Sequence, residues 1–143
     1  MSTMVVDASM AATWMLVDEQ SDSADLVLDL LRSSSGIFPS LFWYETRQLF
    51  LKAERRQRCS IADTRQFLIE LSALPLRSAP DGSDEAILTL ARTHKLSAYD
   101  ATYLESAITA KMPLATADRR LAAAARAAGV ALLGPFAASP LAP

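Results

Sequence analysis

The sequence predicts an α/β fold, with a central, mostly parallel sheet of about four to five short strands and helices on both of its faces. The order of apolar and helical segments along the chain supports this prediction. Short apolar runs alternate along the chain with longer segments of helical periodicity. Strands that are joined through helices pair in parallel, because the crossover helix returns the chain to the same end of the sheet. A length of 143 residues is typical of one domain.

Five short segments are the predicted strands. Each is apolar and is bounded by residues that favour turns or helix starts. The segment at 74–76 contains Pro75, which lacks a backbone donor and is therefore expected at an edge of the sheet. The predicted strands are residues 4–6, 36–38, 74–76, 113–116 and 130–133.

Seven segments have the apolar spacing of helices. Ser40 is expected to cap the third of them, and Ser60 with Asp63 resembles an acidic capping box at the start of the fourth. Gly129 is expected to end the last helix. The predicted helices are residues 9–17, 22–32, 40–56, 60–74, 83–94, 98–110 and 119–128. In the second of these, the expected apolar stripe consists of Leu26, Val27, Leu30 and Leu31.

The composition limits the classes of function. The net charge of −2 neither indicates nor opposes binding to nucleic acid. Cys59 is the single cysteine, so an internal disulfide is impossible and a reducing compartment fits. No apolar run approaches the roughly 20 residues of a membrane helix, and the N-terminus lacks the basic start of a signal peptide. We therefore expect a cytoplasmic protein, with a domain over residues 1–135 and a tail over residues 136–143.

Carboxylates follow two of the predicted strands. Asp7 ends the first strand in VVDAS, and Asp118 follows the strand at 113–116 in LATAD. In open α/β sheets, ligands bind beyond the carboxyl ends of the strands. Asp100 lies in the first turn of the helix at 98–110, and Glu45 lies about one turn into the third helix among apolar neighbours. We expect these four side chains to meet at one rim of the sheet.

Each of these residues also has a purely structural explanation. Asp7 and Asp118 are suited to cap helices, Asp100 to complement a helix dipole, and Glu45 to pair with Arg47. Four carboxylates at one place repel each other, however, unless a cation neutralises them. Oxygen ligands without histidine or cysteine favour Mg²⁺, with Mn²⁺ as a substitute. Such sites commonly activate water for phosphoryl chemistry.

Four segments carry a resemblance to a known family. These are VVDASMAATWML, PSLFWYETRQLF, LSAYDATYLESAI and LATADRRLAAAA, from Val5 to about Leu133. In their order and separation they resemble the PIN-domain ribonucleases, especially the VapC-like toxins of type II toxin–antitoxin systems. The resemblance implies a single PIN-like domain.

The resemblance also implies roles for individual residues. Asp7, Glu45, Asp100 and Asp118 match the family's acidic catalytic and metal-binding positions, with Asp7 and Asp100 as direct ligands. Ser9 and Thr116 match polar positions that hold a water or a substrate phosphate. The candidates for RNA contact come instead from the charges of this sequence: Arg119 and Arg120 follow Asp118 directly. Many relatives carry asparagine three residues after the glutamate, where this chain has Gln48.

The activity implied by the resemblance is that of a Mg²⁺-dependent endoribonuclease that hydrolyses RNA with metal-activated water. A cognate antitoxin would neutralise it by covering the site, along a groove supplied by the hydrophobic helices near the N-terminus. The family resemblance also implies a homodimer, and a larger hetero-oligomer with the antitoxin. A further basic run of Lys52, Arg55, Arg56 and Arg58 is either a solvated helix end or a second phosphate contact.

Other functions compete with this hypothesis. A receiver-like Mg²⁺-dependent phosphoacceptor needs a second carboxylate beside Asp7 and a lysine after a late strand, but Ala8 and Ser9 follow Asp7 and no lysine follows Lys111. A phosphatase of the haloacid-dehalogenase type needs an aspartate where Ser9 stands. The alternative that is not an enzyme is a catalytically silent PIN-fold module, which acts only by sequestering a partner.

Overall fold

The computed structural model describes residues 2–137 and contains one five-stranded, all-parallel sheet. The strand order is β3-β2-β1-β4-β5, so β1 lies at the centre and β3 at one edge. The strands are β1 (Ser2–Val6), β2 (Ser35–Phe38), β3 (Leu76–Ser78), β4 (Leu114–Ala115) and β5 (Leu132–Leu133). The predicted α/β fold class is therefore confirmed, including the position of the proline-preceded strand at an edge.

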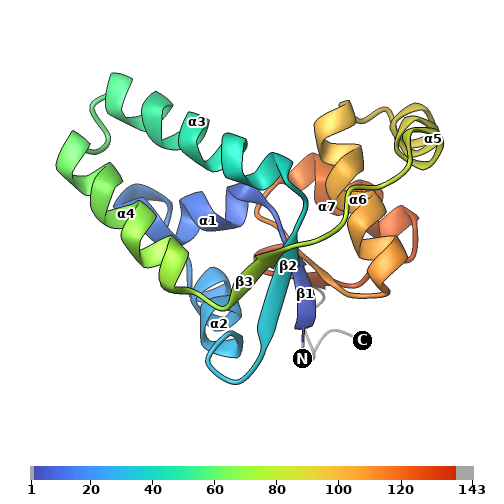
Figure 1. Cartoon of the computed structure of the whole chain (residues 1–143), viewed down its shortest axis with the longest axis horizontal. Helices are drawn as coiled ribbons and strands as arrows, with labels where there is room; N and C mark the ends of the chain where they lie inside the picture. The colour runs from blue at the N-terminus through green and yellow to red at the C-terminus, as the bar shows by residue number, and fades with distance from the viewer. Residues whose placement is uncertain (1, 138–143) are drawn as a thin grey trace.

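Helices cover both faces of this sheet (Figure 1). One side carries α1, α2 and the α3–α4 hairpin, and the other carries α5, α6 and α7. The helices are α1 (Ala8–Met15), the short 3₁₀ helix η1 (Val17–Glu19), α2 (Asp22–Leu30), α3 (Leu41–Arg55), α4 (Ile61–Ala73), α5 (Asp84–His94), α6 (Ala98–Ala110) and α7 (Arg119–Ala127). No helix within residues 2–137 is both long and apolar enough to span a bilayer.

The core lies between the central strands and the helices packed on them. Met4, Val5 and Val6 of β1 are fully buried, as expected for a central parallel strand with a helix layer on each face. Helix α1 is buried along nearly its whole length, from Ala8 to Met15, with only Ser9 partly exposed. Because α1 is enclosed in this way, it does not itself offer an open groove to a partner.

Local sequence signals explain most helix boundaries. Ser60 and Asp63 form the predicted capping box of α4, with both reciprocal hydrogen bonds present. Gly129 follows α7 with a φ of 79°, a conformation that glycine adopts without strain. Ser40, in contrast, does not cap α3 as predicted, because its own backbone is helical and its hydroxyl donates to Asp81 at 2.9 Å.

The apolar stripe predicted for α2 is only partly correct. In α2 only Val27 and Leu31 of the predicted stripe are buried, while Leu26 is 65% and Leu30 47% exposed. The helix packs instead through Ala24, Val27 and Leu31, which have the spacing of one helical face.

In the predicted tail, Phe136 contacts the domain, since its carbonyl accepts from Arg126 at 2.6 Å. The rest of that tail, residues 138–143, lies outside the described residues.

Candidate metal-binding active site

The candidate site lies where the order of the strands reverses. From β1 the chain moves outward to β2 and β3, and then returns to place β4 on the other side of β1. The ends of β1 and β4 are neighbours, with Val6 paired to Ala115. Open parallel sheets bind ligands at such a switch point. Asp7 and Asp118 both follow these two strand ends, as the sequence predicted.

Asp7 is held by three donors and is 3% exposed. Its Oδ1 accepts from the Met10 amide at 3.0 Å and from Ser9 Oγ at 2.7 Å, and its Oδ2 accepts from Thr116 Oγ1 at 2.5 Å. Burial raises the pKa of Asp7 to about 7, although these hydrogen bonds oppose the shift and the charge of Asp118 adds to it. Asp7 therefore caps α1 and also presents a buried carboxylate whose charged form is disfavoured.

Asp118 is the electrostatic centre of the group. It is the N-cap of α7, where its Oδ1 accepts from the Leu121 amide at 3.0 Å. Its negative charge contributes to the raised pKa values of Asp7, Glu45 and Asp100 alike. A charge that acts on all three partners must lie within reach of each of them. The capping explanation and the site explanation of Asp118 are thus both compatible with its position.

Asp100 and Glu45 come from two different helices. Asp100 lies in the first turn of α6, where its amide donates to the capping Ser97 hydroxyl at 3.1 Å. Burial, followed by the charges of Asp118 and Glu45, raises the pKa of Asp100 to about 6, and Arg120 opposes this shift. In α3, burial and then Asp118 raise the pKa of Glu45. The fold thus brings all four carboxylates into one group from four separate segments.

The donor set of this group fits a hard divalent cation, since it consists of carboxylate oxygens with hydroxyls behind them. Within residues 2–137, however, no three His, Cys, Asp or Glu side chains converge closely enough to hold an ion as they stand. Like charges keep apart when nothing neutralises them. Binding of a cation would therefore require side-chain movements that draw the carboxylates together.

Ser9 and Thr116 act on Asp7 in this structure. Their hydroxyls lie 3.3 Å apart, and Ser9 Oγ also accepts from the Ala117 amide at 2.9 Å. Thr116 Oγ1 accepts from the Asp118 amide at 3.0 Å, so one hydroxyl connects two of the carboxylate residues. Thr116 is fully buried, and its side chain reaches Asp7 rather than the surface. These contacts fix the relative positions of the ends of β1 and β4.

The arginines that follow Asp118 differ in their surroundings. Both Arg119 and Arg120 are exposed at the start of α7. The charge of Arg120 lowers the pKa of Asp100, which places this guanidinium close to the carboxylate group. The guanidinium of Arg119 lies 5.1 Å from the ring centre of Phe136. Of these two arginines, Arg120 is therefore the one whose charge acts on a carboxylate of the site.

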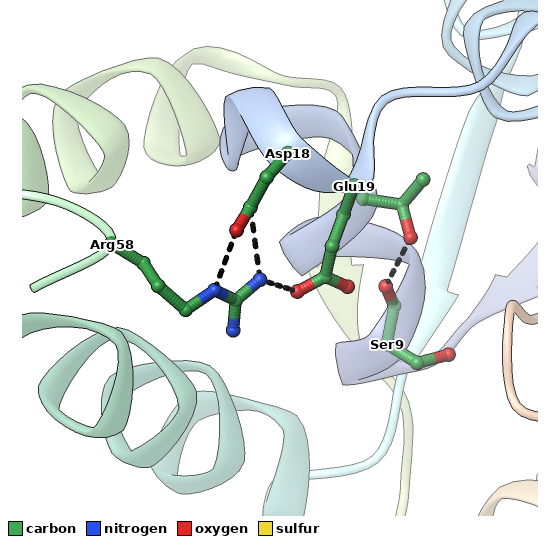
Figure 2. A network of polar contacts seen from close by, with 5 residues as sticks. Ser9, Asp18, Glu19 and Arg58 are labelled. Carbon is green, nitrogen blue, oxygen red and sulfur yellow. Dashed lines mark hydrogen bonds and ion pairs between the residues drawn. The ribbon is translucent and has the colours of Figure 1, made fainter. Parts of the chain in front are cut away.

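The residues of the basic run at the end of α3 also differ in their surroundings. Arg58 donates to both carboxylate oxygens of Asp18, at 2.8 and 2.9 Å, and also contacts Glu19 (Figure 2). These contacts join the α3–α4 connection to η1, so Arg58 serves the fold. Lys52, Arg55 and Arg56 are exposed at the same helix end.

The α3 neighbours of Glu45 also depart from expectation. Arg47 lies over the ring of Trp43, 3.8 Å from its centre, and donates to the Trp43 carbonyl. No ion pair between Arg47 and Glu45 is found in the described chain. Gln48 is exposed.

Tyr103 of α6 also belongs to this site; from the sequence it was a candidate for stacking on RNA bases or for the core, and its place beside Glu45 was not predicted. It is 1% exposed, and its hydroxyl has no hydrogen bond of standard geometry within residues 2–137. Burial and the nearby Glu45 raise the pKa of Tyr103, and the hydroxyl in turn lowers the pKa of Glu45. Its spacing of three residues from Asp100 places both on one helical face. That spacing was the available signal, but helical aromatic residues are common in cores.

Comparison with known proteins agrees with this geometry. The sequence matches the PIN domain family over residues 4–127, and the chain therefore belongs to that family. PIN domains are generally metal-dependent nucleases, which assigns the chain to the hydrolases at this coarse level. No match to a curated protein was found.

The structure is also similar to a solved one. A crystal structure of PAE2754 from Pyrobaculum aerophilum superimposes with a TM-score of 0.71 at 20% identity. The alignment covers 92% of this chain and 89% of that protein. At this level of identity, the similarity concerns the fold alone.

Proposed function

We propose that this protein is a Mg²⁺-dependent endoribonuclease and the toxin component of a toxin–antitoxin module. The observation that carries the nuclease part is the group of four carboxylates at the strand switch point, in which the charge of Asp118 contributes to the raised pKa values of the other three. Burying several like charges together is unfavourable unless a bound cation repays it. A metal-dependent phosphodiester hydrolysis gives these residues a common purpose, and family membership supports the same class.

The residues divide into distinct tasks in this proposal. Asp7 and Asp100 hold the cation, and Asp118 and Glu45 complete its surroundings directly or through water. A bound Mg²⁺ supplies a Lewis acid that polarises water and the phosphate. Ser9 and Thr116 keep Asp7 oriented through the hydrogen bonds described above, and are positioning residues. Arg119 and Arg120 attract the RNA backbone, because exposed guanidinium groups pair well with phosphate oxygens.

The proposed partners are RNA, a cognate antitoxin and a second copy of the chain. Exposed apolar residues near the N-terminal helices support a protein partner: Val17 is 81% and Leu26 65% exposed. They lie on η1 and α2, which take the place of the enclosed α1 as the surface for an antitoxin helix. Isolated exposed apolar residues are common, but a group on adjacent elements favours an interaction surface.

Cleavage assays with purified protein test the catalytic part. We expect RNA cleavage with Mg²⁺, loss of cleavage with a chelator, and recovery when Mg²⁺ is added back. Asp7→Asn and Asp100→Asn, each shown to be folded, should lower the rate by at least about 10³-fold. Asp84→Asn, the same substitution at an exposed position in the first turn of α5, is the comparison variant. Cleavage at the wild-type rate by either Asn variant would show that the site is assigned wrongly.

Expression in cells tests the toxin part separately. Growth arrest by the wild type, its absence with Asp7→Asn, and relief by a small protein encoded next to this gene would all support the proposal. Arrest that persists with folded Asp7→Asn would favour the silent binding module. Mapping of RNA ends after brief expression, against the same variant, would identify the RNA that is cut.

A further inference from the structure

A second buried carboxylate lies outside the group at the strand switch point. Glu105, in the middle of α6, is 7% exposed. Its Oε1 accepts from Thr109 Oγ1 at 2.7 Å, and no other hydrogen bond or ion pair of Glu105 is found within residues 2–137. It is absent from the causes of the raised pKa values of Asp7, Glu45 and Asp100. A single donor leaves most of the acceptor capacity of this carboxylate unused.

This side chain borders a pocket of about 220 Å³. One wall is formed by Glu105, Ser106 and Thr109 of α6, and the other by residues 79–82, which follow β3. The backbone of this loop lies directly on the carboxylate, because a Cβ added at Gly82 would come within 2.0 Å of Glu105 Oε2. Glycine at position 82 therefore allows the carboxylate to occupy its place in the wall.

The pocket is acidic and offers unused acceptors. A second hollow of about 430 Å³ adjoins it and shares Glu105 and Thr109 in its lining. In the described chain, Asp81, Glu85 and Glu105 line these hollows and no Lys, Arg or His does. Ser106, 6% exposed, lines the first pocket, and its buried Oγ has no hydrogen-bond partner within residues 2–137. The site thus lacks a cationic hydrogen-bond donor.

We propose that this pocket binds the ammonium or guanidinium group of an aliphatic cation, with Glu105 as its counter-ion. Such groups have several N–H donors and no acceptor, which matches a carboxylate beside an unused hydroxyl. Ile37, Pro80 and Ala110 in the lining provide apolar contact for the methylene groups. The pocket is smaller than the roughly 300 Å³ at which drug-sized ligand sites begin, so it suits a head group and a short chain. The proposal is independent of the nuclease activity.

A binding titration of the full chain tests this inference. The probes are n-butylammonium and n-butylguanidinium at constant ionic strength, with n-butanol as the neutral comparison. Binding is detected from changes in the amide chemical shifts of the protein. We expect saturable shifts at Gly82, Ser106 and Thr109 with the two cations and none with the alcohol. Glu105→Gln should weaken binding at least tenfold, whereas Glu70→Gln, the same charge change on the exposed face of α4, should not.

Unsaturable shifts, or equal affinity of wild type and Glu105→Gln, would overturn the proposal. Should Glu105→Gln fail to fold, Gly82→Ala keeps the charge and forces the carboxylate to move. Folded Gly82→Ala that binds as tightly as the wild type would also overturn it. A capped Ala-Ala-Arg-Ala-Ala peptide then distinguishes a protein partner from a free small cation as the source of the bound group. If the peptide binds more tightly than butylguanidinium, the pocket binds an arginine of a protein partner. If the peptide binds more weakly, the pocket binds a free small cation.

Discussion

The two ends of α3 hold charges in opposite ways. At its start, Glu45 belongs to a group of carboxylates in which burial, with the charge of Asp118 added, raises the pKa values of Asp7, Glu45 and Asp100. Arg120 opposes the shift at Asp100. Beyond the end of α3, Arg58 pairs with Asp18 and Glu19 at the surface (Figure 2). Paired surface charges contribute modestly to stability. Grouped like charges cost stability, so their retention at a ligand-binding position of the fold favours a functional role.

After the loss of cleavage expected for Asp7→Asn and Asp100→Asn, the next largest effect should follow from removing the charge of Asp118. Asp118→Asn keeps a side chain that is able to cap α7 but removes the charge that acts on Asp7, Glu45 and Asp100. We expect the rate of RNA cleavage to fall by about 10²–10³-fold, because the cation loses one of its charged partners. We also expect the pKa of Asp100 to move down toward its ordinary value, as measured by NMR titration of the carboxyl carbons in metal-free protein. An unchanged pKa would contradict the central placement of Asp118.

The next effect concerns stability and pH. The folded pKa of Asp7, about 7, lies above its ordinary value of 3.8, so the folded state binds more protons than the unfolded state between these values. The contribution of Asp7 to stability is therefore greatest below about pH 4 and is lost as the pH rises through 7. At pH 8 without metal, Asp7→Asn should be more stable than the wild type by on the order of 2 kcal/mol.

Denaturant unfolding at pH 4 and pH 8 measures this difference, which should be small at the lower pH. Mg²⁺ should stabilise the wild type at pH 8 more than Asp7→Asn, because ligand binding to the folded state adds to its stability. Asp18→Asn, on the paired side of the comparison, is the control and should not gain stability at pH 8. A wild type that becomes more stable from pH 4 to pH 8, relative to Asp7→Asn, would contradict the burial of an unneutralised charge.

A smaller effect should come from Tyr103. Its hydroxyl lowers the pKa of Glu45, so Tyr103→Phe should raise that pKa further. The pKa of Asp7 is the internal control, since the hydroxyl of Tyr103 is not among the groups that shift it. Stability should change little, because the phenol makes no hydrogen bond of standard geometry in the described chain. A Glu45 titration that is identical in both proteins would show that Tyr103 only fills the core.

Much of this molecule was predictable from the sequence, for physical reasons. Strand and helix periodicities differ, so the alternation of elements and the parallel sheet followed from the apolar pattern. Asp7 and Asp118 were recognisable because each directly follows a buried strand, and the ends of parallel strands share one edge. The capping box at Ser60 was predictable because its hydrogen bonds are local in sequence.

The errors arose where distant contacts override local pattern. Ser40 was expected to cap α3, but its hydroxyl donates to Asp81, which is 41 residues away in sequence. Leu26 and Leu30 fit an apolar stripe, yet the face of α2 that packs is the one bearing Val27 and Leu31. The role of Tyr103 beside Glu45 depends on how α3 and α6 meet. Periodicity indicates which residues are buried, but not which polar atom a buried hydroxyl will face.

The smallest effect should follow from breaking the paired charges. Arg58→Ala removes the contacts with Asp18 and Glu19 that join η1 to the α3–α4 connection. Since these groups are partly exposed, we expect the Tm to fall by less than about 3 °C, and the difference to shrink at high salt as screening weakens the pairs. RNA cleavage should be unchanged. Arg56→Ala, an exposed arginine of the same run, is the matched control for loss of positive charge. A loss of cleavage with Arg58→Ala but not with Arg56→Ala would mean that the α3–α4 connection positions Glu45, and that the two ends of α3 are not independent.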